Sequence, residues 1–117
     1  EIGGTPDFSH YHQRLCISRL LWLVSVTIPD SVTFIGNRAF NRCHGLEFVT
    51  LPSSITSINE GTFCECNSLT SIVIPYSVTS IEKDALRQCY CLKNVFVPKQ
   101  LQYNWNTFPV GATINKY

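Results

Sequence analysis

Cysteine and histidine are the residues of this 117-residue chain whose types and spacing could support chemistry. Two Cys-x-Cys motifs are present, Cys64-Glu65-Cys66 and Cys89-Tyr90-Cys91, and four cysteine thiolates are a common ligand set for zinc. His10 and His12 add two imidazoles at strand spacing, and His44 adds a third. Zinc binding, disulfide formation and thiol reactivity are therefore the chemistries to test against the arrangement of the chain.

A constant period of 23 residues organises that arrangement. Period lengths of about 20 to 50 residues indicate a solenoid, in which each unit buries its apolar face by stacking on its neighbours. The recurring residues are an opening leucine (Leu23, Leu46, Leu69, Leu92), a proline (Pro29, Pro52, Pro75, Pro98), an isoleucine (Ile35, Ile58, Ile81), a small residue (Ala39, Thr62, Ala85) and a cysteine (Cys43, Cys66, Cys89).

The repeat phase argues against a metal site. Cys66 and Cys89 share an inward column with Cys43, whereas Cys64 and Cys91 each fall in a different phase, so the four sulfurs of the two motifs do not converge on one ion. We predict buried structural thiols and no metal ligands. A disulfide between stacked cysteines stays open, because stacked Cα atoms about 5 Å apart lie within the disulfide range. Cys64 and Cys91 are the more accessible thiols.

Catalysis and nucleic-acid binding find no support in the remaining residues. The histidines have no carboxylate or cysteine partner in phase, and no G-x-S-x-G, H-E-x-x-H or glycine-rich phosphate loop occurs. A net charge of +1 without clustered Lys and Arg gives no electrostatic footprint for nucleic acid. We predict no enzyme activity, no catalytic residues, no small-molecule cofactor and no nucleic-acid partner.

Each repeat is expected to consist of a strand, a second extended piece and a compact turn. In residues 69–74 the two-residue alternation points Leu69, Ile72 and Ile74 inward, and proline then ends the strand because it lacks an N–H. A second extended piece is expected over 78–81. A helical or 3₁₀ turn should then carry Ala85, Leu86 and Cys89 inward.

The ends of the chain depart from the repeat. The expected organisation is a degenerate repeat or N-terminal cap over 1–22, leucine-rich repeats over 23–98 (23–45, 46–68, 69–91 and a partial 92–98) and a C-terminal cap over 99–117. Trp105, Phe108 and Val110 are expected to fold over the last coil. The sequence contains no Met, so we expect a processed chain or a segment of a longer protein, and the apolar stretch 20–26 is too short to span a bilayer.

The unit L-x-x-I-x-I-P-x-x-V-x-x-I-x-x-x-A-F-x-x-C-x-x, seen over 23–45, 46–68 and 69–91, resembles the BspA-like leucine-rich repeat family. The resemblance covers about two thirds of the chain and implies an α/β fold, a right-handed leucine-rich-repeat solenoid with a short parallel sheet on its concave face. Family members are commonly surface or secreted proteins that bind host matrix proteins or other cells. No catalytic residues come with the family.

A candidate binding surface follows from the positions that the repeat leaves free. The outward columns of the concave face read Ser25, Phe48, Ser71, Asn94 and Thr27, Thr50, Val73, Phe96. Phe48, Val73 and Phe96 form a stepped apolar patch, and an exposed apolar cluster with polar edges suits a protein partner. Alternatively, the C-terminal cap covers Phe96, and the patch is then not a binding site. The predicted partner-binding residues are Phe48, Val73, Phe96, Thr50, Ser71, Glu47 and Lys93.

These observations favour a non-enzymatic adhesion or recognition module, at the cell surface or secreted, that binds a host, matrix or other cell-surface protein through its concave face. The alternative is a cytoplasmic structural component of a larger assembly. A thiol- or metal-dependent activity at Cys64, Cys66, Cys89 and Cys91 is a third reading. Exposed coil ends also leave self-association possible.

Overall fold

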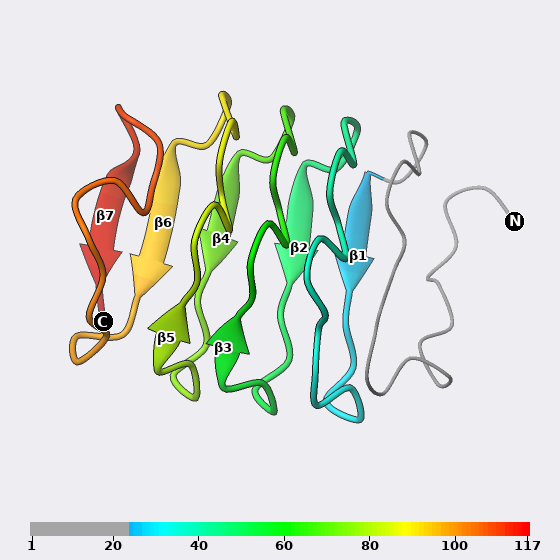
Figure 1. The fold of residues 1–117 in the computed structure, drawn as a ribbon, viewed down its shortest axis with the longest axis vertical. Helices are drawn as coiled ribbons and strands as arrows, with labels where there is room; N and C mark the ends of the chain where they lie inside the picture. Colours follow the sequence, from blue (N-terminus) through cyan, green and yellow to red (C-terminus); the bar gives the residue numbers. More distant parts are fainter. Residues whose placement is uncertain (1–23) are drawn as a thin grey trace, which may run out of the picture.

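A computed structural model describes residues 24–117, which form a stack of coils joined by parallel strands (Figure 1). Five strands make the larger sheet, in the order β1-β2-β4-β6-β7, and two make a smaller one, β3-β5. The strands are β1 (Ser25–Thr27), β2 (Phe48–Thr50), β3 (Ser57–Ile58), β4 (Ser71–Val73), β5 (Ser80–Ile81), β6 (Asn94–Val97) and β7 (Thr113–Lys116). The predicted first unit, 1–22, and Leu23 lie outside the described residues.

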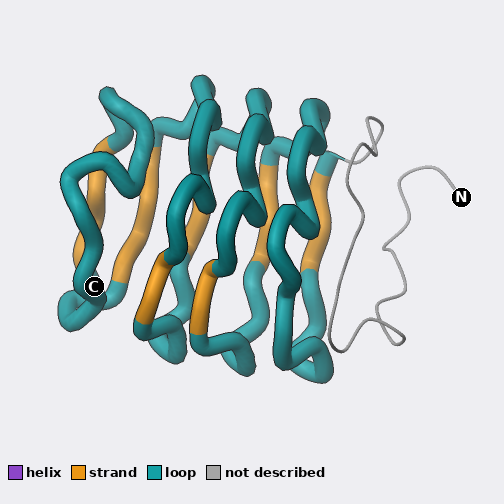
Figure 2. Tube along the Cα trace, viewed as in Figure 1, coloured by secondary structure: helices purple, strands orange, loops and turns teal. Residues whose placement is uncertain are grey.

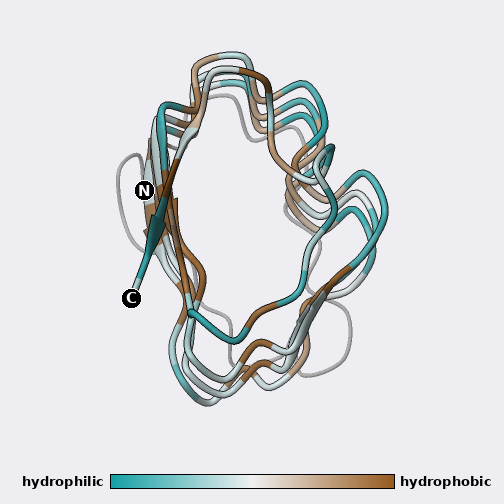
Figure 3. Ribbon diagram, turned by 90° about the vertical axis from the view of Figure 1, so that its left-hand side faces the viewer, coloured by the Kyte–Doolittle hydropathy of each residue, from teal (hydrophilic) through white to brown (hydrophobic). Residues whose placement is uncertain are grey.

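The strand register confirms the 23-residue period. Ser25 lies opposite Phe48, Phe48 opposite Ser71, and Ser71 opposite Asn94, all in parallel pairs. Ser57 lies opposite Ser80 in the smaller sheet by the same step. Viewed end-on, the coils superpose into one oval, so equivalent residues of successive coils lie above one another (Figure 3).

Alternation along the strands separates the core from the surface. In β4, Ile72 is buried while Val73 points outward, as the two-residue period predicts. The buried residues of the coils form continuous apolar columns with almost no exposed area. One column holds Phe40 and Phe63, whose rings stack with centroids 5.2 Å apart, and Leu86 takes the next place in it.

The compact turn after the second extended piece is not a helix. None of the residues 24–117 is helical (Figure 2), so the α part of the expected α/β class has no counterpart there, and the handedness of the coils stays a prediction. Bonds from residue i+3 back to residue i do form, as from Cys66 N to Phe63 O (3.2 Å). Left-handed residues interrupt each turn and prevent helix propagation, with φ near +60° at Arg38, Gly61 and Asp84 and again at Arg42, Glu65 and Gln88.

Two of the turns each direct the backbone amides of three alternate residues toward the next coil. We call the resulting set of inter-coil bonds the turn ladder. Its members are Arg38 N to Glu60 O (2.9 Å), Phe40 N to Thr62 O (2.9 Å), Arg42 N to Cys64 O (2.9 Å), Gly61 N to Lys83 O (3.2 Å), Phe63 N to Ala85 O (2.8 Å) and Glu65 N to Arg87 O (2.7 Å).

The C-terminal segment departs from the period. The step between paired strand residues shortens from 23 residues (Ser71 to Asn94) to 19 (Asn94 to Thr113), and β7 extends the sheet by one strand that the sequence did not predict. Of the three apolar residues expected over the end, Phe108 is buried, whereas Trp105 and Val110 project almost fully into solvent.

Candidate interaction surface

The outward side chains of the five-stranded sheet form one continuous surface, which we call the sheet face. Successive strands place Phe48 beside Ser71, and Val73 beside Phe96. The structure therefore confirms both outward columns that the repeat phase predicts, while their use in binding stays a prediction.

Three large apolar side chains stand out from this face. Phe48 is 50% exposed, Val73 is 53% exposed and Phe96 is 37% exposed. We call them the apolar patch. Phe96 retains this exposure although β7 continues the sheet beyond it and pairs Asn115 with it, so the C-terminal segment does not cover it.

The positions around the apolar patch carry neutral polar groups. At the outward positions of β1, β2, β4, β6 and β7 no ionisable side chain occurs within residues 24–117. Hydroxyl and amide groups fill the remaining places, at Ser25, Thr27, Thr50, Ser71, Asn94, Thr113 and Asn115. A partner on this face would meet hydrogen-bonding groups and apolar surface but no charge.

Opposite charges lie at the rim, in the column that precedes the strands. Glu47 and Lys93 are both exposed, and Thr70 holds the equivalent position in the repeat between them. The column is ordered by backbone bonds from Thr70 N to Glu47 O (3.2 Å) and from Lys93 N to Thr70 O (2.9 Å). All seven predicted binding residues therefore lie on or beside the sheet face.

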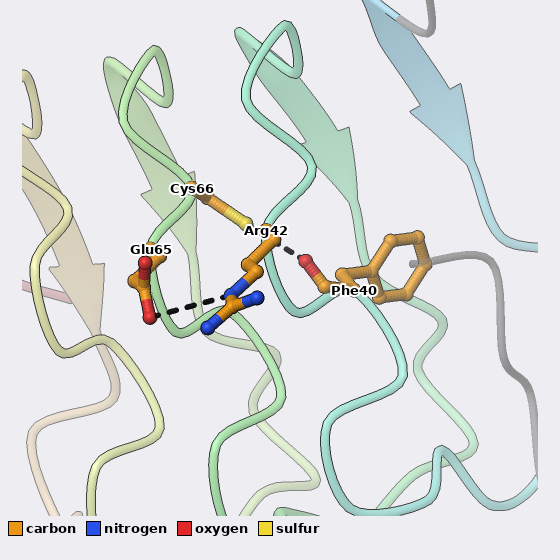
Figure 4. Close-up of polar contacts among 4 residues, drawn as sticks. All are labelled: Phe40, Arg42, Glu65 and Cys66. Atoms are coloured by element: carbon orange, nitrogen blue, oxygen red, sulfur yellow. Dashed lines mark hydrogen bonds and ion pairs between the residues drawn. The ribbon is translucent and has the colours of Figure 1, made fainter. Parts of the chain in front are cut away.

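The cysteines are arranged as the repeat phase predicts. Cys66 and Cys89 are buried, and each thiol donates to a carbonyl of the preceding coil. Cys66 Sγ donates to Phe40 O at 3.1 Å (Figure 4), and Cys89 Sγ donates to Phe63 O at 3.1 Å. Burial raises the pKa of the Cys66 thiol and raises that of Cys89 to about 12. These thiols are therefore protonated structural groups at neutral pH.

The other two thiols lie outside this column. Cys64 is half-buried, and burial, followed by the charge of Glu65, raises its pKa. Cys91 is exposed, and no disulfide joins Cys64, Cys66, Cys89 or Cys91. Within residues 24–117, no three His, Cys, Asp or Glu side chains gather where they could hold a metal ion.

An ion pair crosses the turn ladder on the outside of the coils. Arg42 Nε lies 3.7 Å from Glu65 Oε2 in the following coil (Figure 4). Both side chains are substantially exposed, so solvent screens the attraction and its contribution to stability is small.

Sequence reasoning missed a cleft of about 880 Å³ at the C-terminal end of the stack. It lies between the last turn of the repeats and the loop over 103–112, with Leu86 and Arg87 on one side and Tyr103 and Phe108 on the other. The decay of the repeat after Pro98 was the available signal, because the segment that follows the last repeat turn no longer matches the template and cannot be expected to stack on that turn in the same way.

The family of the chain is now established. Residues 17–109 match the family model described as the BspA type leucine rich repeat region, in six copies. The chain belongs to the BspA-type leucine-rich repeat family, and leucine-rich repeat families are generally protein-interaction modules. No curated protein matches the chain, and no helix in its described part has the length and apolar character needed to cross a membrane.

Three solved structures are similar to the chain. A leucine rich cell surface protein from Faecalibacterium prausnitzii is 33% identical, with a TM-score of 0.79 over 85% of this chain and 27% of that one. A T. pallidum leucine rich repeat protein is 28% identical (TM-score 0.47, 65% and 46% covered), and a leucine-rich repeat protein from Bacteroides ovatus is 20% identical (TM-score 0.44, 95% and 44% covered). The chain spans less than half the length of each.

Proposed function

We propose that the chain is a non-enzymatic recognition module of a cell-surface or secreted protein, and that it binds a host, matrix or other cell-surface protein through the concave strand face. The observation that carries the proposal is the apolar patch, three large side chains between about one third and one half exposed on a rigid sheet. Membership of the BspA-type family and likeness to a cell surface protein support it.

The chemistry of the face supports a neutral mode of recognition. Phe48, Val73 and Phe96 supply apolar area, and neighbouring hydroxyls such as those of Thr50 and Ser71 supply hydrogen bonds. Strands paired on both sides hold these groups at fixed spacing, so little ordering entropy is lost on binding. The charged residues among the predicted binding residues, Glu47 and Lys93, lie at the rim, where they bias orientation and association rate more than affinity.

The test is a double substitution of Phe48→Ser and Val73→Ser, with capture of individual immobilised matrix proteins measured by biolayer interferometry. Truncating buried anchor residues at an interface costs about 2 kcal/mol or more, so we expect capture to weaken by roughly thirtyfold or more. Exposed substitutions change stability little, and the melting temperature should stay nearly constant.

A matched control is available on other faces. Phe34 is 46% exposed and Val110 is fully exposed, so the pair Phe34→Ser and Val110→Ser removes the same side-chain types outside the sheet face. We expect this variant to bind like the unmodified chain. Equal capture by both double variants would refute the proposed face, and a strong dependence on ionic strength would refute neutral recognition.

A further inference from the structure

The turn ladder has a direction. In both of its complete junctions the amides belong to the earlier coil and the carbonyls to the later one. An ordinary strand edge alternates donors and acceptors along its length. The turn ladder therefore differs from the sheet, because it presents only donors toward the C-terminal end of the stack.

The last turn of the repeats has no following coil to accept these donors. By the 23-residue period, the amides of Asp84, Leu86 and Gln88 take the places of Gly61, Phe63 and Glu65. Among residues 24–117 no group accepts a hydrogen bond from these three amides. The chain reaches β7 after a short step and leaves the path that a further turn would follow.

The three residues that carry these amides line the cleft of about 880 Å³. Its other walls are mixed, with Ile81, Tyr103, Phe108 and Ile114 beside the polar Asn104, Asn106 and Thr107. The Tyr103 and Phe108 rings pack edge-on with centroids 5.2 Å apart. A buried backbone N–H without an acceptor is costly, and Leu86 is 1% exposed. A row of unpaired donors beside walls that offer both apolar and polar groups is suited to binding another polypeptide.

We propose that this end of the stack is a docking site for a turn of a leucine-rich-repeat coil carried by a partner protein. The chain's own junctions specify the matching chemistry. Three carbonyls from alternate residues accept the three amides, as Glu60, Thr62 and Cys64 do for the preceding coil. A small residue stands at the central carbonyl, Thr62 or Ala85, both buried, and a large apolar residue follows it.

Other occupants fit this row less well. An ordinary strand would bring its own N–H groups against a row that offers no acceptors, leaving them unpaired. A single anion would not serve three amides from alternate residues, since each equivalent amide inside the stack has a separate carbonyl as its acceptor. The site is distinct from the sheet face, so it can bind a second protein at the same time.

The test uses a capped heptapeptide with the sequence of residues 82–88, Glu-Lys-Asp-Ala-Leu-Arg-Gln. Within the fold the carbonyls of Lys83, Ala85 and Arg87 fill the preceding row, so this peptide carries the required acceptors. It is titrated into the isotope-labelled full chain while the amide resonances are followed by NMR. We expect saturable shifts at Asp84, Leu86 and Gln88 and none at Phe48.

The control peptide has the same composition with its Ala and Lys exchanged, which puts a bulky side chain at the central carbonyl. It should bind at least about tenfold more weakly. Equal binding of the two peptides, no saturable shift at the three amides, or shifts confined to β7 would each overturn the proposal. Self-association of the chain that perturbs these amides without peptide would assign the site to a second copy instead.

Two variants locate the interaction on the chain. Replacing the Leu86 amide by an ester, through ligation at Cys66 and Cys89, removes one N–H that has no intramolecular acceptor and keeps the side chain. Asn106→Trp fills the cleft from an exposed position. Each should weaken peptide binding by at least about tenfold with an unchanged circular dichroism spectrum. Unchanged peptide affinity in both would place the peptide elsewhere and overturn the proposal.

Discussion

The sheet face and the turn ladder are two sides of the same coils, and they end differently. On the sheet side, each strand from β1 to β7 has a parallel neighbour, and the last junction is made by the C-terminal segment. On the turn side, the ladder stops after two complete junctions and leaves Asp84, Leu86 and Gln88 without acceptors among residues 24–117.

Backbone conformation explains this difference. Extended residues expose an N–H and a C=O on the same edge, so any strand in register can continue a sheet. The four residues of β7 are enough for that purpose. In the turns the inter-coil donors lie on one side and the acceptors on the other, so a turn of the same shape is needed to continue the ladder. The sheet tolerates an irregular end, whereas the turn side requires a true repeat.

The largest expected effect is the loss of unfolding free energy when a packed side chain of the turn side is truncated, either inside the stack or at its end. Phe63 is fully buried against Phe40, whereas Leu86 holds the next place in the column and borders the cleft. Substituting Phe63→Ala should lower the free energy of unfolding by about 4 kcal/mol, and Leu86→Ala by about 2 to 3 kcal/mol. Urea denaturation measures both. A loss for Leu86→Ala as large as that for Phe63→Ala would show that the end is packed like the interior.

The sheet side and the turn side also differ in their ionisable groups, and the next prediction concerns the effect of pH on stability. The outward positions of the sheet carry no ionisable groups, whereas burial raises the pKa of Cys66 and raises that of Cys89 from 9.0 to about 12. The unfolded thiol loses its proton near pH 9 while the folded one keeps it. Stability is therefore intact below about pH 9 and falls toward pH 12, by about 1.4 kcal/mol per pH unit for each thiol.

Urea unfolding at neutral pH and at about pH 10.5 measures this loss, with Cys89→Ala as the control. The variant should lose less stability between the two pH values because one buried thiol is gone. Identical losses in the variant and the unmodified chain would show that Cys89 does not contribute to the alkaline sensitivity.

A smaller effect tests the left-handed positions of the turns. Gly61 has φ +65°, and a Cβ there would lie 2.9 Å from Arg38 Cγ of the preceding coil. Gly61→Ala should therefore lower the free energy of unfolding by about 1 to 2 kcal/mol through backbone strain and this contact. In an Arg38→Ala background, urea denaturation should show a smaller loss. An unchanged loss would remove the contact from the explanation.

Much of the fold was predictable because a repeat multiplies weak signals. The period gave the register, the buried columns, the inward cysteines and the outward positions of Phe48 and Val73, and the structure confirms each of these. A single strand of three residues would have been unpredictable, but three copies in phase fix the direction of each side chain.

Two features were not predictable, for physical reasons. Glycine signals the left-handed conformation at Gly61, but Arg38 and Asp84 are ordinary residues at positive φ; at Arg38 a bond from its amide to Glu60 O of the next coil accompanies this conformation. The expected helical or 3₁₀ turn is therefore found as separate turns with bonds from residue i+3 to residue i, and no helix forms within residues 24–117. The strand β7 escaped notice because residues 113–116 lack the leucine and proline of the template and pair after a shortened step.

The most direct measurement of the difference between the two sides is amide hydrogen exchange followed by NMR at three positions. Phe63 N is bonded within the turn ladder (2.8 Å to Ala85 O), Thr113 N is bonded on the sheet side (2.7 Å to Lys93 O), and Leu86 N has no acceptor among residues 24–117. The Phe63 and Thr113 amides should exchange at least about a hundredfold more slowly than the Leu86 amide. Exchange at Leu86 as slow as at Phe63 would show that its N–H is already bonded, and would contradict the open end described for the turn ladder.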